Sequence, residues 1–296
     1  MNKEEIQNWF KSLQDSICTA LEETDEKGKF EQDLWTRPEG GGGRTRILQN
    51  GNIIEKGGVN FSAVEGPTPN KILQALGLDK ADFFATGVSI VMHPISPMVP
   101  IIHMNVRYFE MSNGINWFGG GIDLTPHYVV DEDAKYFHRT MKDTCDRHHS
   151  SYYTDFKKWA DDYFFIKHRK ETRGIGGIFF DRLNEKDGIS MEDRWKFVQD
   201  VGSQFAPIYT RFMTKNKDLA YGENEKAWQY LRRGRYVEFN LVLDKGTKFG
   251  LDTDGRTESI LMSLPPQANW AYQFEPKTGS KEEETLNKLK KGIDWI

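Results

Sequence analysis

Cysteine is scarce in this sequence, which has only Cys18 and Cys145 among its 296 residues. The two form neither a C-x-x-C pair nor a zinc-knuckle spacing, which excludes an iron–sulfur cluster held by a local cysteine motif. Apolar runs are also short, and none approaches the roughly 20 residues that a membrane-spanning helix needs. Basic residues show no excess, since 40 Lys and Arg stand against 44 Asp and Glu. The composition therefore gives no sign of nucleic-acid binding.

Nucleotide-binding and targeting motifs are missing as well. Gly40 to Gly43 lack the Lys-Ser/Thr pair of a phosphate-binding loop, and residues 174–183 lack the G-x-G-x-x-G spacing and the following helix of a dinucleotide site. The N-terminal M-N-K-E-E-I-Q-N-W-F is acidic and amphipathic, unlike a signal or transit peptide. We therefore expect a cytoplasmic protein without a membrane span, and without a flavin, haem, nicotinamide or iron–sulfur cofactor.

What the sequence does contain is enough apolar material for a sizeable core. Hydrophobic residues make up 38% of the chain and aromatic residues 13%. We find no internal repeat and no Pro/Ser-rich linker, so we expect residues 1–296 to form a single domain. Strands outnumber obvious β-α-β units and several are joined by short turns. The predicted fold class is therefore α+β, with a large, mostly antiparallel sheet flanked by helices on both faces.

Periodicity places the individual elements. Apolar steps of three and four predict helices at 2–21, from Asp131, at 155–169, at 191–212 with a kink or break at Pro207, at 224–233 and from Ser280 to the end. Alternation predicts strands at 174–183 and 236–244. Asn50-Gly51 is expected at the tip of a hairpin.

Two β-rich runs stand out, at 86–93 and 101–108, and three prolines separate them. Strand side chains alternate between the two faces of a sheet, so each run can be sorted by parity. One parity is apolar, and the other carries Ser89, His93, His103, Asn105 and Arg107. If the two runs pair, these five side chains lie on one surface.

This polar parity has two interpretations. Most alternating strands simply turn a polar side toward water. Solvated faces are usually rich in Lys, Glu and Thr, however, whereas imidazole, amide, hydroxyl and guanidinium groups suit metal binding, proton transfer or a carboxylate held in a fork. We therefore treat the surface as a candidate site and keep the solvated sheet as the alternative.

The segment from Gly40 to Gly43 also has two interpretations. It is either a flexible surface loop or a mobile flap whose Arg37, Arg44 and Arg46 close over an anion. Four consecutive glycines beside three arginines favour the flap.

Several longer motifs identify a family. They are R-P-E-G-G-G-G-R-T-R, L-Q-N-G-N-I-I-E-K-G-G-V-N-F-S, H-M-N-V-R, W-F-G-G-G-I-D-L-T-P, Y-V-E-F-N-L-V-L-D-K-G-T-K-F-G-L and G-R-T-E-S-I-L-M-S-L-P-P. With these motifs the chain resembles oxygen-dependent coproporphyrinogen III oxidases over nearly its whole length. The resemblance implies oxidative decarboxylation of two propionates of coproporphyrinogen III to vinyl groups, which gives protoporphyrinogen IX with molecular oxygen as co-substrate. It also implies a homodimer, with residues 236–272 in the dimer segment.

The resemblance further implies roles for individual residues. Substrate contacts are implied for Ser89, Asn105, Val106, Arg107, Asp254, Gly255 and Arg256. Divalent-metal ligands are implied at His93, His103, His138 and His168, with His103 also a proton donor. We therefore expect these four imidazoles to converge on a divalent metal ion, with the organisation of hydrogen bonds as the alternative role. Asp244 is implied to contact the pyrrole nitrogens, with the role of a turn acid beside Lys245-Gly246 as the alternative. Asp123 lies in a motif linked to activity.

Two positions depart from the family pattern. Asp254 stands where the substrate loop usually has glycine, which places an acid beside an anionic substrate. Lys245 replaces a common arginine, which keeps the charge but loses bidentate geometry.

Two other functions are weighed against the oxidase. A non-catalytic tetrapyrrole-binding protein would need the arginines but no acid or base, and His103 and Asp244 argue against it. A metal-dependent hydrolase would explain the histidines, but the sequence lacks H-E-x-x-H or a similarly close spacing.

Overall fold

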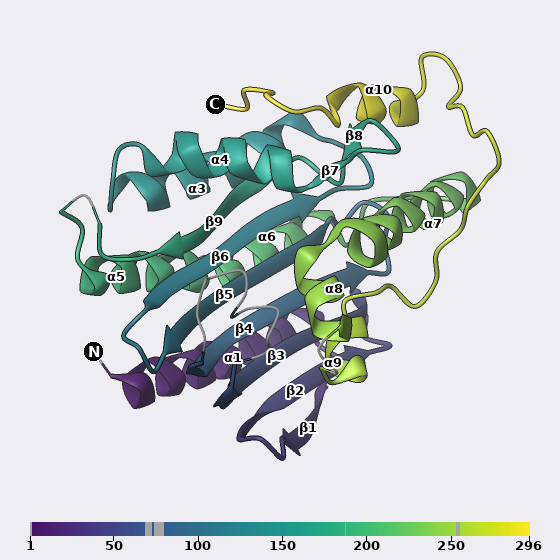
Figure 1. The fold of residues 1–296 in the computed structure, drawn as a ribbon. Coiled ribbons are helices and arrows are strands. Elements are labelled where there is room, and N and C mark those ends of the chain that lie inside the picture. Colours follow the sequence, from purple (N-terminus) through teal and green to yellow (C-terminus); the bar gives the residue numbers. More distant parts are fainter. Residues whose placement is uncertain (1, 69–72, 74–79, 187, 253–254) are drawn as a thin grey trace.

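A computed structural model describes residues 2–68, 73, 80–186, 188–252 and 255–296, without the side chain of residue 249. It confirms the predicted α+β class. Its main feature is a seven-stranded sheet in the order β1-β2-β3-β4-β5-β6-β9, in which every neighbouring pair is antiparallel (Figure 1). The strands are β1 (Phe30–Thr36), β2 (Gly41–Gln49), β3 (Ile54–Pro67), β4 (Asp82–Pro94), β5 (Ile101–Met111), β6 (Asn116–Thr125) and β9 (Gly177–Leu183), and β7 (Phe165–Ile166) pairs with β8 (Glu171–Thr172).

The remaining elements are helical. They are α1 (Lys3–Asp25), α3 (Asp131–Asp146), α4 (Tyr152–Tyr163), α5 (Met191–Ser203), α6 (Phe205–Asn216), α7 (Glu223–Glu238), the π-helix η1 (Phe239–Leu243), α8 (Lys245–Asp252), α9 (Thr257–Leu261) and α10 (Lys281–Lys288). Asn2 and Glu5 form the capping box expected at the start of α1. Among the described residues, no helix combines the length and the apolar character needed to cross a bilayer.

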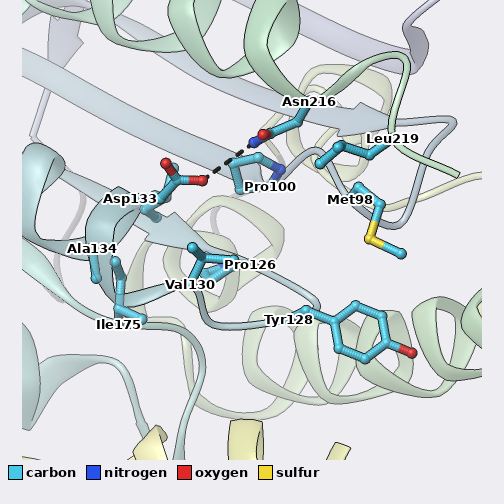
Figure 2. A pocket seen from close by; sticks show the side chains of 11 residues that line it. Met98, Pro100, Pro126, Tyr128, Val130, Asp133, Ala134, Ile175, Asn216 and Leu219 are labelled. Carbon is cyan, nitrogen blue, oxygen red and sulfur yellow. Dashed lines mark hydrogen bonds between the residues drawn. The ribbon is translucent and has the colours of Figure 1, made fainter. Parts of the chain in front are cut away.

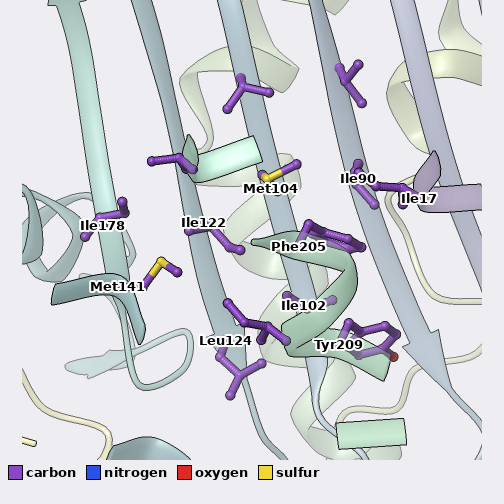
Figure 3. Close-up of a cluster of buried hydrophobic side chains, with 14 of the residues drawn as sticks. Ile17, Ile90, Ile102, Met104, Ile122, Leu124, Met141, Ile178, Phe205 and Tyr209 are labelled. Atoms are coloured by element: carbon purple, nitrogen blue, oxygen red, sulfur yellow. The ribbon is translucent and has the colours of Figure 1, made fainter. Parts of the chain in front are cut away.

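One face of the sheet carries the main hydrophobic core. Apolar side chains of β3 to β6 and β9 pack there against α1, α3, α5 and α6. Figure 3 shows the centre of this layer, where Ile90, Met104 and Ile122 from three strands meet Phe205 and Tyr209 of α6. The β-branched and aromatic residues of the strands suit such a pleated, half-buried surface.

The opposite face of the sheet is covered only in part. The segment from α7 to α9 lies over it at one end, in front of the strands in Figure 1. Tyr236 of α7 packs there on Val91 and Ile101. At the β9 edge, Phe164 and Phe239 join the end of α4 to η1 in a second small core. This side therefore leaves room for polar groups on the central strands.

The strand predicted at 236–244 is wrong, because α7 and η1 occupy that segment. A strand would have buried Val237, Phe239, Leu241 and Leu243 on one side. The structure instead buries Tyr236 and Phe239, at helical spacing, while Leu241 is 42% exposed. The arginines of α7 form ion pairs with acids that lie far away in the sequence, and these pairs stabilise the helix. They outweigh the weak local preference of this segment for a strand.

Four predicted helix limits also need correction. The helix predicted at 155–169 ends at Tyr163, where α4 gives way to β7. The helix predicted at 224–233 does not end at Gly234, which lies inside α7, where a Cβ would come within 2.5 Å of the Asn269 carbonyl oxygen. The break in the 191–212 helix falls at Gln204, not Pro207, because Pro207 fits the first turn of α6. The last helix ends at Lys288 rather than at the end of the chain.

The glycine-rich segment, predicted as a loop or a flap, is mostly part of a strand. Gly41 to Gly43 begin β2, and a Cβ on Gly43 would lie 2.2 Å from the Trp35 ring. Arg44 and Arg46 both pair with Asp15 of α1, on the core side of the sheet. The glycines therefore allow close packing of a hairpin, and the two arginines do not face an anion site.

Candidate functional site

The two central runs pair with each other as β4 and β5, which meets the condition set for a shared surface. Ser89 lies opposite Asn105, and the same row continues to Asn60 on β3 and to Gly121 on β6. The neighbouring rows carry Arg107 and His103. We call the surface formed by Asn60, Ser89, His103, Asn105 and Arg107 the polar face. His93, the fifth side chain predicted for it, is fully buried against Tyr236 and is not exposed there.

Glycines make this surface flat around Arg107. Gly87 and Gly119 lie opposite Arg107 on the two neighbouring strands. A Cβ on Gly119 would lie 2.8 Å from the Nη2 atom of Arg107, so a larger residue there would push the guanidinium out of its present position. A flat surface of this kind suits a flat ligand.

His103 is held by a buried ion pair. Its Nδ1 lies 2.8 Å from Asp123 Oδ1, and Asp123 is also bound by Nη2 of Arg173 at 2.7 and 2.8 Å. Because the carboxylate only accepts hydrogen bonds, Nδ1 of His103 carries the proton. Nε2 is then the ring nitrogen of His103 that remains for contact with a ligand. The His103 side chain is 22% exposed, so it is reachable from the polar face.

Asp123 and Arg173 stay charged although both are buried. Burial alone would raise the pKa of the Asp123 carboxyl, but the charge of Arg173 and the bond from His103 lower the pKa below its ordinary value. The rings of Phe164, Tyr236 and Phe239 surround the Arg173 guanidinium at 4.4–4.7 Å. Sequence reasoning missed Arg173, whose only sign is a charge directly before a glycine-rich strand entry.

Arg107 lies between two polar partners. Its Nη1 donates to Asn105 Oδ1 at 2.7 Å, and its Nη2 donates to Asp181 Oδ1 of β9 at 2.7 Å. Its side chain is 36% exposed. Sequence reasoning also missed Asp181, because no local motif marks it.

Arg256 lies at the other side of the polar face, at the start of α9. It pairs with Asp33 of β1 and donates to Ser259 Oγ. Ser259 in turn joins α9 to the sheet, because its carbonyl accepts from Asn60 Nδ2 at 2.8 Å. Gly255 precedes Arg256 and donates its N–H to the Gly250 carbonyl. Asp254 lies outside the described residues.

Asp244 follows η1 and has two structural partners. Tyr163 donates its hydroxyl to Oδ1 at 2.7 Å, and the Thr247 N–H donates to Oδ2 at 2.7 Å. Asp244 therefore joins α4 to the first turn of α8, the role of a capping acid. Lys245, the second departure from the family pattern, begins α8. The pKa of the Tyr163 hydroxyl is raised by burial and by the Asp244 charge.

Val106 does not turn its side chain toward the polar face. It is fully buried in the main core on the other side of β5. Only its backbone borders the polar face.

The four histidines do not converge. Each forms hydrogen bonds with a different partner. His93 is bonded to the Ser263 carbonyl, and His103 is bonded to the Asp123 carboxylate. His138 is bonded to the Tyr153 hydroxyl and the Ile175 carbonyl, whereas His168 is bonded to the Glu238 carboxylate. No group of three or more His, Cys, Asp or Glu with the arrangement of a metal site occurs in the part of the chain that the structure describes. Both ring nitrogens of His138 are engaged within the protein. The donor set does not fit a single four-imidazole centre.

Two cavities among the described residues lie away from the polar face. A cavity of about 50 Å³ lies among the end of β6, the start of α3 and the end of α6, with Leu124, Ala134 and Ile175 in its wall (Figure 2). An open groove of about 500 Å³ lies between α1 and the β1–β2 hairpin. Neither involves His103, Asn105 or Arg107, so the polar face is marked as the candidate site by its chemistry and not by these two cavities.

Comparison with known proteins bears on the chemistry of this surface. The family model described as coproporphyrinogen III oxidase matches residues 5–295. An oxygen-dependent coproporphyrinogen-III oxidase of Drosophila melanogaster is 50% identical over 298 residues, which cover 96% of this chain and 76% of the relative. Two chloroplastic coproporphyrinogen-III oxidases, from Arabidopsis thaliana and Glycine max, are each 46% identical over 306 residues. These cover 98% of this chain and 78% and 79% of the relatives.

Proposed function

Because this chain belongs to the coproporphyrinogen III oxidase family, we propose that it catalyses the oxygen-dependent conversion of coproporphyrinogen III to protoporphyrinogen IX in porphyrin biosynthesis. The observation that carries the proposal is the match to oxygen-dependent relatives over nearly the whole chain. The polar face supports it, because the substrate is a macrocycle with four carboxylates and pyrrole N–H groups. Arginine forks suit the carboxylates, and a flat glycine-lined surface suits the rings.

The reaction is a two-electron oxidation of each propionate. A –CH2–CH2–COO⁻ group loses carbon dioxide and a hydride equivalent and becomes –CH=CH2. With one proton, dioxygen takes up the two electrons and becomes hydrogen peroxide, so atoms and charge balance. The two electrons come from the propionate side chain, and the electron-rich pyrrole ring that carries it is the group expected to react with dioxygen. The protein has to bind and orient the macrocycle and manage protons.

We assign binding to the two arginines and proton handling to His103. Arg107 and Arg256 grip propionates, while Ser89 and Asn105 offer hydrogen bonds beneath the macrocycle. Asp123 keeps the Nδ1 proton of His103 in place, which leaves Nε2 to exchange a proton with the substrate.

We assign to Asp244 the stabilisation of positive charge on the pyrrole rings. Its carboxylate is half-buried and already fixed by Tyr163 and Thr247, so it needs no reorganisation when charge develops. No step of this proposal passes through a metal, because the four histidines do not form a single four-imidazole centre among the described residues.

Gas measurements in a closed cell test the proposal. Wild-type protein with coproporphyrinogen III should take up about two O₂ and release about two CO₂ per macrocycle, following the balance above, without added flavin or nucleotide. Asp244→Asn should lower turnover at least roughly a hundredfold, as expected when a positioned electrostatic group is lost. A tetrapyrrole-binding protein would bind the macrocycle with no gas exchange, and a hydrolase would release no CO₂ coupled to O₂ uptake. Either result would overturn the proposed function.

We also propose a homodimer. Leu241, Val242 and Trp270 are 42%, 50% and 53% exposed, and Tyr272 is 92% exposed. They lie in or next to residues 236–272, the segment that resembles the family's dimer segment, so a second copy of the chain is the partner that fits.

The cytoplasmic location stays a prediction, and cell fractionation tests it.

A further inference from the structure

An ion pair lies across the polar face at the point assigned to propionate binding. Arg107 belongs to β5 and Asp181 to β9, and β6 runs between them. The pair bridges β6 above Gly119, where a Cβ would lie 2.6 Å from Asp181 Oδ1 and 2.8 Å from Arg107 Nη2. The absence of a side chain at this one position lets the two groups meet.

The Asp181 carboxylate makes the contact that a substrate carboxylate would make. It accepts from Nη2 at 2.7 Å, and the side chains of Arg107 and Asp181 are 36% and 32% exposed. A guanidinium has five N–H donors, and the described residues use two of them here, through Asp181 and Asn105. The remaining donors leave room for a ligand carboxylate to share or to displace Asp181.

The proposed reaction, on which this inference rests, changes the charge of the ligand. The macrocycle begins with four carboxylates, passes through a species with three and ends with two. An arginine that holds a carboxylate in the first complex can lose that partner in the last. A guanidinium left unpaired beneath a bound macrocycle costs free energy, whereas a carboxylate of the protein close by restores the pair.

We infer that Asp181 is an internal carboxylate that pairs with Arg107 whenever no carboxylate of the macrocycle does. It competes with the substrate for Arg107 and compensates for the lost carboxylate after decarboxylation. Asp181 therefore narrows the difference between the protein's affinity for a macrocycle with four carboxylates and its affinity for one with two. Arg256 is paired with Asp33 in the same manner at the other side of the face.

The test uses Asp181→Asn, which keeps a hydrogen-bond acceptor beside Arg107 and removes the charge. Binding of two air-stable aromatic macrocycles is measured by fluorescence: coproporphyrin III with four carboxylates and protoporphyrin IX with two. The variant should bind coproporphyrin III roughly two- to fivefold more tightly, the range for a half-exposed ion pair. Its affinity for protoporphyrin IX should change less. In turnover, kcat and KM should fall together, because the gain is in ground-state binding.

Two controls keep the result specific. Asp15→Asn removes an exposed acid that pairs with Arg44 and Arg46 on the core side of the sheet, and should change neither affinity. In an Arg107→Gln background, Asp181→Asn should lose its effect, because the two residues act as a pair.

The outcomes separate this inference from the proposed function. If Asp181→Asn binds coproporphyrin III more weakly or equally, Asp181 only holds Arg107 in place or does nothing, and the inference is overturned while the proposed function stands. If the wild-type protein binds neither macrocycle and forms no vinyl product, the proposed function fails first.

Discussion

Arg107 and Arg256 are the groups of the polar face best suited to bind carboxylates. Both guanidinium groups already pair with acids of the protein, which shows that each can hold a carboxylate where it lies. Changing either arginine to Ala should weaken substrate binding by roughly 1.5–3 kcal/mol, the range for charge-assisted hydrogen bonds. The KM for coproporphyrinogen III measures the loss. Arg211→Ala, on α6 against Tyr136, serves as the control. Unchanged kinetics in both site variants would remove these arginines from the site.

His138 gives the protein a pH-dependent stability. Burial lowers its pKa from 6.5 to about 4, so the unfolded chain binds a proton that the folded chain does not between these values. Stability should therefore fall as pH drops from about 6.5 to 4, by up to about 3 kcal/mol for this residue. Buried His93 and His127 act in the same direction.

Urea unfolding of wild type and His138→Gln between pH 7 and 4 measures this effect. The variant should lose less stability across that range, whatever its absolute stability. His149→Gln, at an exposed position, should keep the wild-type slope. An unchanged slope in His138→Gln would show that His138 does not titrate as described.

At the scale of single residues, sequence reasoning found what local pattern encodes. The side chains of Ser89, Asn105 and Arg107 share one face because strand parity is local. Arg173 and Asp181 were missed because their partners lie 50 and 74 positions away, and no motif links them.

The elements differ in how far their own sequences determine them. The pairing of β4 with β5 follows from alternation and from the prolines between them. The helical form of the segment from α7 to η1 does not follow from its own sequence, because its apolar residues fit a strand as well as a helix. Contacts with Glu55 and Glu171, far away in the sequence, stabilise the helical form.

Gly234 tests this account of α7. By helix propensity alone, Gly234→Ala would stabilise the helix by up to about 1 kcal/mol. The added Cβ would instead meet the Asn269 carbonyl at 2.5 Å, so we expect a net loss of about 1–3 kcal/mol, typical of overpacking. Thermal unfolding measures the change. A raised midpoint would contradict the close approach of residues 269–270 to α7.

At the scale of the whole molecule, the α+β class and the antiparallel sheet followed from the sequence. One large core contains residues from Ile6 of α1 to Trp295 near the end of the chain. It is the basis on which we propose that residues 1–296 form one domain. The histidines show the limit of such reasoning. Strand alternation places His93 and His103 on one face of the sheet, but it says nothing about residues on predicted helices. Whether His138 and His168 converge with them could therefore not be checked from the sequence.

The exposed apolar residues of η1 and of the segment after α9 lead to a prediction about assembly. We expect a two-fold dimer that buries more than roughly 1,000 Å² in total, the size of a specific interface. Sedimentation equilibrium at micromolar concentration measures it. Leu241→Glu should shift the protein toward monomer, whereas Leu219→Glu, at a similarly exposed site after α6, should not. A monomeric wild-type protein would contradict the prediction.

The most direct test of the account is product analysis after wild-type protein is mixed with coproporphyrinogen III, in air and under argon. Chromatography of the macrocycles after oxidation to their aromatic forms separates species with four, three and two carboxylates. We expect a divinyl, two-carboxylate product in air and unchanged four-carboxylate macrocycle under argon, with no added flavin or nucleotide. Vinyl product formed at full rate under argon, or no vinyl product in air, would contradict it.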